Sequence, residues 1–185
     1  SFGIETASEE GLKVLRKGSK MKQNIEALKL CRKHGITTIA DFIIGLPHER
    51  SYEDALNSVK TLTYDYRPDF AQFSILRLYP NTEIFDQAVE KGLIEKDKWS
   101  KWAMNPLETP LIVDHWHEYI SAEQLVKLQK KAYRIFYLRT SAVWNHIKQI
   151  RSFYQIKVKL KGMLSVIGIN LVGFKFKSNF ESQIK

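Results

Sequence analysis

The sequence predicts an α/β protein made of three repeated strand–loop–helix units, followed by a helical extension. Three short apolar segments each end in polar residues: Phe2–Thr6, Ile39–Glu49 and Phe70–Pro80. Helical patterns follow them, and this alternation predicts right-handed crossovers and a parallel sheet. Ligands bind such sheets at the carboxyl ends of the strands, so these polar ends are the candidate site.

The helices between the strands have recognisable ends. Ser8, Ser51 and Thr82 each precede an apolar periodic stretch, where a hydroxyl can cap the first turn. A further helix is predicted over 21–34, and Gly35 supplies the left-handed residue that stops it.

The strands themselves are apolar. Ile36–Ile44 is rich in β-branched residues and predicts a strand buried on both faces. Asp69–Leu78 is the third strand, closed by Pro80. Three strands alone would leave both sheet edges open and largely apolar. Because Ser1 leads directly into a strand without an initiator Met, we expect the chain to be the C-terminal part of a longer protein.

The first half of the chain is neutral overall and the second half is basic. Residues 1–92 hold 13 Lys/Arg and 13 Asp/Glu, whereas residues 93–185 hold 16 and 7. After residue 92 a tryptophan-rich segment shows no clear period, and a long helix is predicted over 121–139. We therefore expect three parts: the β/α units over 1–92, a helical extension over 93–161, and a basic, apolar tail over 162–185. The tail's apolar run of 12 residues is too short to span a bilayer, which needs about 20.

Three motifs occur in order at the strand ends: Gly3–Thr6 (GIET), Phe42–Glu49 (FIIGLPHE) and Ala71–Thr82 (AQFS…YPNT). They resemble segments of the radical S-adenosylmethionine (radical SAM) superfamily, in the group that usually carries an N-terminal cobalamin-binding domain. The resemblance covers residues 1–90 well and extends loosely to about 153. It implies the C-terminal half of a partial TIM-like (β/α) barrel, as its fourth, fifth and sixth β/α units.

The resemblance also implies one wall of an S-adenosylmethionine pocket. Glu5 would accept hydrogen bonds from the ribose or the methionyl ammonium, Gly45 would admit the ligand to the backbone, and Glu49 would shape the adenine loop. The full set of implied cofactor-binding residues is Glu5, Thr6, Ile43, Gly45, Glu49, Gln72 and Ser74. A simpler alternative makes Glu5 and Glu49 helix N-terminal acids that stabilise the dipole. No catalytic residue is assigned.

Two positions depart from the family pattern, because His48 and Asn81 replace glycines. Asn tolerates a positive φ and His less so, and a solvated loop residue is the simplest interpretation of His48. The family's 4Fe–4S cluster needs a CxxxCxxC loop, but this chain holds a single cysteine, Cys31, predicted to be a buried apolar side chain. The chain alone therefore cannot make a 5′-deoxyadenosyl radical, and we assign it no metal ligand.

The resulting hypothesis is part of a radical SAM enzyme acting on a small-molecule substrate. It would use S-adenosylmethionine, with the 4Fe–4S ligands and any cobalamin domain outside this chain, for methyl transfer or oxidative cyclisation. The alternative is a non-catalytic module whose basic tail binds a membrane surface or RNA; lysines around the apolar run favour the membrane, and no specific nucleic acid is expected. The expected location is the cytoplasm, peripheral to the inner membrane.

Two further site types are disfavoured. An aldolase-type barrel should carry a lysine or paired acids at its strand ends, whereas Arg77 and Asp41 are predicted within strands. The segment His115–Glu118 looks like a metal site, but histidines two apart diverge on a helix and lack HExxH spacing. A solvent-facing pair or a lid over the substrate pocket fits that segment better.

Overall fold

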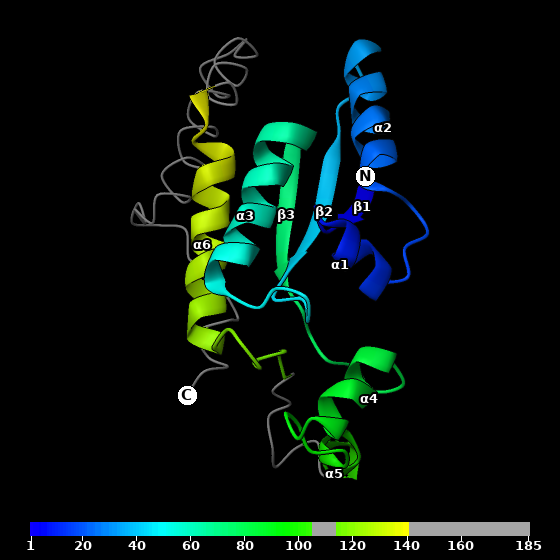
Figure 1. Cartoon of the computed structure of the whole chain (residues 1–185), viewed down its shortest axis with the longest axis vertical. Helices are drawn as coiled ribbons and strands as arrows, with labels where there is room; N and C mark the ends of the chain where they lie inside the picture. Colours follow the sequence, from blue (N-terminus) through cyan, green and yellow to red (C-terminus); the bar gives the residue numbers. More distant parts are fainter. Residues whose placement is uncertain (105–113, 141–185) are drawn as a thin grey trace.

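The computed structural model describes residues 1–104 and 114–140, which form a parallel sheet flanked by helices (Figure 1). The strands β1 (Phe2–Glu5), β2 (Ile39–Ile44) and β3 (Phe70–Ile75) lie in the order β1-β2-β3. Both neighbouring pairs are parallel. The predicted parallel β/α arrangement is therefore confirmed, although the second and third strands are shorter than predicted. Closure of the sheet into a barrel stays a prediction.

The helices begin and end close to the predicted signals. They are α1 (Glu9–Val14), α2 (Met21–Lys33), α3 (Tyr52–Thr61), the π-helical turn η1 (Leu62–Tyr66), α4 (Glu83–Glu90), α5 (Lys98–Met104) and α6 (Ala122–Tyr137). The side chains of Ser8, Ser51 and Thr82 each accept a hydrogen bond from a first-turn N–H, as expected. The sequence patterns did not predict η1 or α5, which are each shorter than two helical turns.

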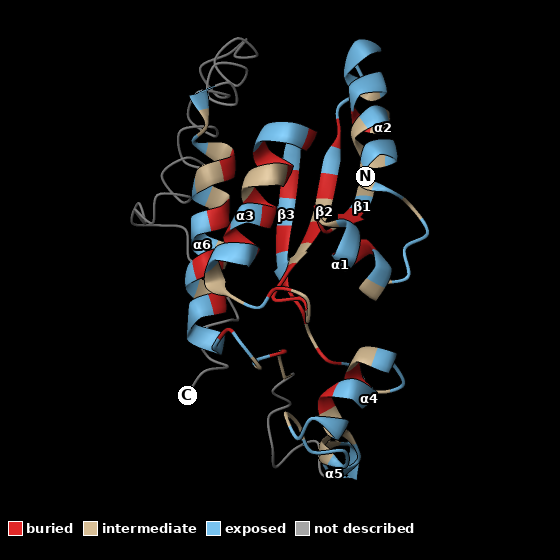
Figure 2. Ribbon diagram, viewed as in Figure 1, coloured by how far each residue is buried: buried red, intermediate tan, exposed pale blue. Residues whose placement is uncertain are grey.

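One face of the sheet carries the main core. Ala40, Phe42 and Ile44 of β2 point to it, and α2, α3 and α6 cover it (Figure 2). The alternate residues of β2 do not: Ile39 is 43% exposed, and Asp41 and Ile43 are half-buried. The prediction that β2 is buried on both faces is therefore wrong, because among the described residues only Ile43 on this face packs against an apolar cluster.

The outer edge of β3 is covered by α6. Tyr137 Oη donates to Ala71 O at 2.9 Å and accepts from Ala71 N–H at 3.2 Å. One turn earlier in α6, Tyr133 Oη accepts from Phe73 N–H at 3.2 Å. One turn before that, Gln129 Nε2 donates to Phe73 O at 2.8 Å. The spacing suits both elements, since four helical residues rise about 6 Å and two strand residues about 6.6 Å. The expectation of two open edges is therefore wrong for β3.

A second apolar cluster lies beyond the carboxyl end of β3. Leu76 and Leu78 pack there with Phe85 and Ala88 of α4 and with Trp116. The chain around Asp114 runs beside the end of β3, because Asp114 O accepts from Leu78 N–H at 3.0 Å. This hydrogen bond places the end of the tryptophan-rich segment next to the chain that follows β3.

Several other expectations can be compared with the structure. Cys31 is half-buried rather than buried, because α2 is largely exposed at the sheet's margin. The helix α6 falls in the predicted extension yet packs in the same core as the sheet; the boundaries at 92 and 161 stay predictions. Residues 141–161 of the predicted helical extension and the predicted tail over 162–185 lie outside the described residues. Within 1–104 and 114–140, no helix is long and apolar enough to cross a membrane.

The substitution Tyr137→Phe should destabilise the fold. It removes the hydroxyl that pairs with both backbone groups of Ala71, leaving polar groups at the edge of β3 without that partner. We expect a loss of about 1–3 kcal/mol in the free energy of unfolding, measured by urea denaturation of the full chain. Tyr64→Phe, at a half-exposed ring in η1, is the matched control and should change stability little. Equal effects of the two variants would contradict the edge contact.

Candidate functional site

The uncovered face of the sheet carries a polar row across all three strands. Asp41 lies in register with Gly3 on one side and with Gln72 on the other. In the next row Ile43 is in register with Ser74. Gln72 and Ser74 are exposed, and Asp41 and Ile43 are half-buried. Three predicted cofactor-binding residues, Ile43, Gln72 and Ser74, therefore share one face.

Glu5 joins the same row through an unusual backbone. Its φ is +62°, a left-handed conformation rare for a residue other than glycine, asparagine or aspartate. Its Oε1 lies 2.5 Å from where a Cβ on Gly3 would stand, and 3.3 Å from Lys17 Nζ. A larger residue at position 3 would have to displace the ends of the Glu5 and Lys17 side chains. Since α1 begins at Glu9, the alternative of a helix N-terminal acid is wrong for Glu5.

Thr6 and His48 lie next to Gly11 of α1 and do not belong to the polar row. Thr6 is fully buried, and a Cβ built on Gly11 would lie 2.6 Å from both Thr6 Oγ1 and His48 Cε1. Within the described residues, Thr6 Oγ1 and both ring nitrogens of His48 have no hydrogen-bond partner. Burial lowers the pKa of His48, partly offset by Glu10 and Asp54. The prediction of a solvated loop histidine is therefore wrong, and Thr6 is not brought together with the residues of the polar row.

Glu49 fastens the loop that follows β2. It is 2% exposed, and its Oε2 accepts from Gly45 N–H at 2.6 Å and from Leu46 N–H at 3.0 Å. Burial raises the pKa of Glu49 to about 7, against the lowering effect of the hydrogen bonds from the Leu46 and Gly45 N–H groups and of the Ser58 hydroxyl. Since α3 begins at Tyr52, Glu49 is not a helix N-terminal acid either.

Gly45 is required by both its backbone and its surroundings. Its φ is +79°, and a Cβ built there would lie 2.8 Å from Leu125 Cδ2 of α6. Asn81, at the other position where the family has glycine, has φ +63°, as an asparagine readily allows. Gly45 directly follows β2, whereas Asn81 lies just before Thr82, the N-cap of α4.

Sequence reasoning missed three polar residues near the strand ends. Asp41 is the single acid within β2 and lies in the polar row, which its isolation among apolar residues could have indicated. Arg77 lies two residues beyond β3, so its predicted place within the strand is wrong. His115 Nδ1 lies 3.1 Å from Leu76 O, and burial lowers its pKa. Nothing in the spacing of His115 predicted a contact with a strand end 39 residues earlier.

The described residues do not fit a resident metal. Among residues 1–104 and 114–140, no three His, Cys, Asp or Glu side chains gather as a metal site would need. His117 Nδ1 contacts His115 O, and Glu118 pairs with Lys91 at 2.6 Å, so the segment for which a metal site was disfavoured is held by protein contacts. A 4Fe–4S cluster held by three thiolates does not fit, because the whole chain has one cysteine.

Comparison with known proteins gives several relatives. An uncharacterized methyltransferase of Pyrococcus horikoshii is 34% identical over 167 residues, covering 89% of this chain and 34% of that protein. An anaerobic magnesium-protoporphyrin IX monomethyl ester cyclase of Cereibacter sphaeroides is 28% identical over 140 residues, 75% of this chain and 21% of its own. A bacteriochlorophyllide d C-12(1)-methyltransferase of Chlorobaculum tepidum is 27% identical over 148 residues, 72% and 28% of the two chains. No protein-family profile matches.

The similarity to these methyltransferases and cyclases agrees with the three motifs at the strand ends. The chain belongs to the radical S-adenosylmethionine superfamily. It spans 34% of the length of the Pyrococcus relative and 21% of the Cereibacter cyclase.

Glu49→Gln should remove the part of the pH dependence of folding stability that comes from titration of the Glu49 carboxyl group. Because folding raises the carboxyl pKa from 4.5 to about 7, the folded state favours the protonated form, and stability should fall by roughly 3 kcal/mol as pH rises through that window. Gln keeps an acceptor for the two N–H groups and carries no titrating proton. Urea denaturation of both proteins between about pH 5 and about pH 8 measures the difference. If the free energies of unfolding of the two proteins changed with pH in parallel, folding would not raise the pKa of Glu49.

Gly45→Ala should be much more damaging than Gly35→Ala. Both glycines have positive φ, +79° and +68°, so both variants bear backbone strain of about 1–2 kcal/mol. Only at Gly45 does the new methyl meet Leu125, whereas nothing lies within 4 Å of a Cβ at Gly35. We expect a further loss of about 1–3 kcal/mol at Gly45, read from urea midpoints. Equal losses at the two positions would mean that α6 does not press on this loop.

Proposed function

We propose that this chain forms the C-terminal part of a radical SAM enzyme and supplies one wall of its S-adenosylmethionine pocket. The observation that carries the proposal is the polar row on the uncovered sheet face, where Glu5, Asp41 and Gln72 lie together. The relatives named as methyltransferases and as a cyclase support a transformation of a small-molecule substrate, by methyl transfer or oxidative ring closure.

The residues of this wall would bind and orient the ligand. The Glu5 carboxylate can accept hydrogen bonds from hydroxyl or ammonium groups, and Gln72 can both donate and accept. Ile43 would contact the ligand from its half-buried side on the sheet face. The space that a Gly45 side chain would need is occupied by Leu125 of α6, so Gly45 would act by shaping the loop. Glu49 would act indirectly, by holding the N–H groups of Gly45 and Leu46 in place.

The 4Fe–4S cluster would be bound by residues outside this chain, because the chain offers one cysteine. Cobalamin dependence is proposed on the family resemblance alone, and no residue here is assigned to cobalamin. The reading frame that contains the chain tests both. A CxxxCxxC segment encoded before Ser1 supports the proposal, and a complete frame without one overturns it.

Glu5→Gln should weaken S-adenosylmethionine binding in the protein encoded by the complete frame. Loss of a charged acceptor typically costs about 1.5–3 kcal/mol, so we expect the dissociation constant to rise roughly ten- to a hundredfold. Isothermal titration calorimetry measures it, with Glu26→Gln on the exposed side of α2 as the matched control. Unchanged affinity in Glu5→Gln, or a similar loss in the control, would remove Glu5 from the pocket.

A further inference from the structure

The carboxyl ends of three helical elements meet at the end of the sheet where the strands begin. Arg32 of α2 donates from Nη2 to Arg67 O at 2.6 Å and to Tyr66 O at 3.3 Å, at the end of η1. Arg139, just past α6, donates to Pro68 O at 2.7 Å. The side chains of Arg32, Arg67 and Arg139 are close enough to influence one another electrostatically. These contacts define one continuous surface, which we call the amino-end face.

The amino-end face is cationic. Its basic residues are Arg32, Lys33, Arg67 and Arg139, and its acids are Asp65 and Asp69, so four positive and two negative charges give +2. Favourable interaction with helix carboxyl ends explains some of this charge. It does not explain the apolar side chains that lie among the cations.

Those apolar side chains are exposed. Leu30 is 58% exposed, Ile36 is 57% exposed, and Tyr64 and Leu138 are also exposed. Each is adjacent in sequence to the helix ends that carry the cations. Six of the nine exposed large hydrophobic side chains of the described residues lie toward this end: Leu30, Ile36, Ile39, Tyr64, Phe70 and Leu138. Exposed apolar side chains gathered in this way indicate a contact surface.

We propose that the amino-end face binds an anionic membrane surface. Cations attract acidic headgroups, at about 1 kcal/mol for each Lys or Arg, while aliphatic side chains enter the boundary with the acyl chains. Nucleic acid fits less well, because bases stack on aromatic rings, whereas four of the six exposed apolar side chains at this end are aliphatic: Leu30, Ile36, Ile39 and Leu138.

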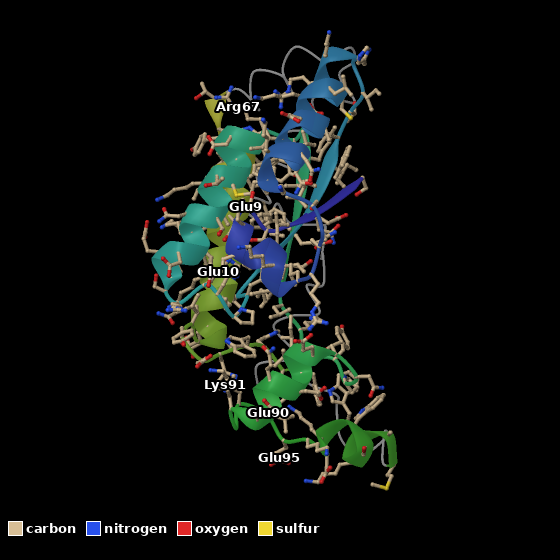
Figure 3. All side chains as sticks on the ribbon, turned by 45° about the vertical axis from the view of Figure 1, so that its right-hand side comes forward. Glu9, Glu10, Arg67, Glu90, Lys91 and Glu95 are labelled. Atoms are coloured by element: carbon tan, nitrogen blue, oxygen red, sulfur yellow. The ribbon has the colours of Figure 1, made fainter. Side chains whose placement is uncertain are left out.

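The place of this face in the molecule is compatible with the proposed site. The strands run in parallel away from it, so their carboxyl ends lie at the opposite end. Figure 3 shows Arg67 at one end of the molecule and Lys91 and Glu95 at the other. Residues 141–185, which follow Arg139 and Thr140 in the sequence, hold eight Lys/Arg and one acid. The inference does not depend on the proposed enzymatic function.

The test is co-sedimentation of the full chain with vesicles of phosphatidylcholine, with and without about a third phosphatidylglycerol. The variant Leu30→Ser/Lys33→Glu alters the face, and Met104→Ser/Lys96→Glu makes the same chemical and charge change at exposed positions elsewhere. We expect salt-sensitive binding to the anionic vesicles, weakened about tenfold or more in the first variant and nearly unchanged in the second.

A second variant separates lipid contact from charge and from any loss of α2. Ile36→Ser lies beyond the helix and leaves the net charge unchanged. It should weaken vesicle binding about three- to tenfold and leave the circular dichroism spectrum unaltered. Wild-type binding by both face variants would assign the effect to residues 141–185 and overturn the proposal. Binding to an RNA oligonucleotide but not to anionic vesicles would overturn it as well.

Discussion

The contact between α6 and the outer edge of β3 is the interaction on which the described fold depends. An edge strand carries backbone N–H and C=O groups that need hydrogen-bond partners. Side chains of α6 make hydrogen bonds to the backbone groups of Ala71 and Phe73. The same helix buries Phe136 against Phe73, with ring centroids 6.0 Å apart. One helix therefore both closes the edge of the sheet and completes its core.

The position of α6 also constrains the candidate site. Leu125, on its first turns, lies where any side chain at residue 45 would have to be. From within the loop, Glu49 holds the N–H groups of Gly45 and Leu46. The loop after β2 is thus fixed from two sides, and the cost is a buried carboxyl group with a raised pKa. Strained backbone and perturbed acids of this kind gather at functional sites.

The two ends of the sheet differ in chemistry. At the carboxyl end, the backbone-strained Glu5 lies on the face of the proposed pocket. At the amino end, arginines bind backbone carbonyls among exposed aliphatic side chains. Parallel strands keep these two ends apart. A membrane contact at one end would therefore leave the other accessible to ligands.

The sequence by itself determined the type and order of most elements, because caps and strand ends are local signals. Ser51 before α3 and the capping box of Ser121 before α6 depend on residues three positions apart. The three strand-end motifs were likewise contiguous, and they indicated the family correctly. Strand alternation also explains why the residues of the polar row share one face. The sequence patterns placed Asp41 in a strand but assigned it no role in the site.

Only the tertiary structure decided which groups are buried and what they bind. The burial of one face of β2 depends on helices contributed by distant parts of the chain. The partner of Ala71 is a tyrosine 66 residues away, and that pairing leaves no local pattern. Glu49 is buried and the adjacent His48 is half-buried, each in different surroundings. Burial depends on segments far apart in sequence, so no short motif could have predicted it.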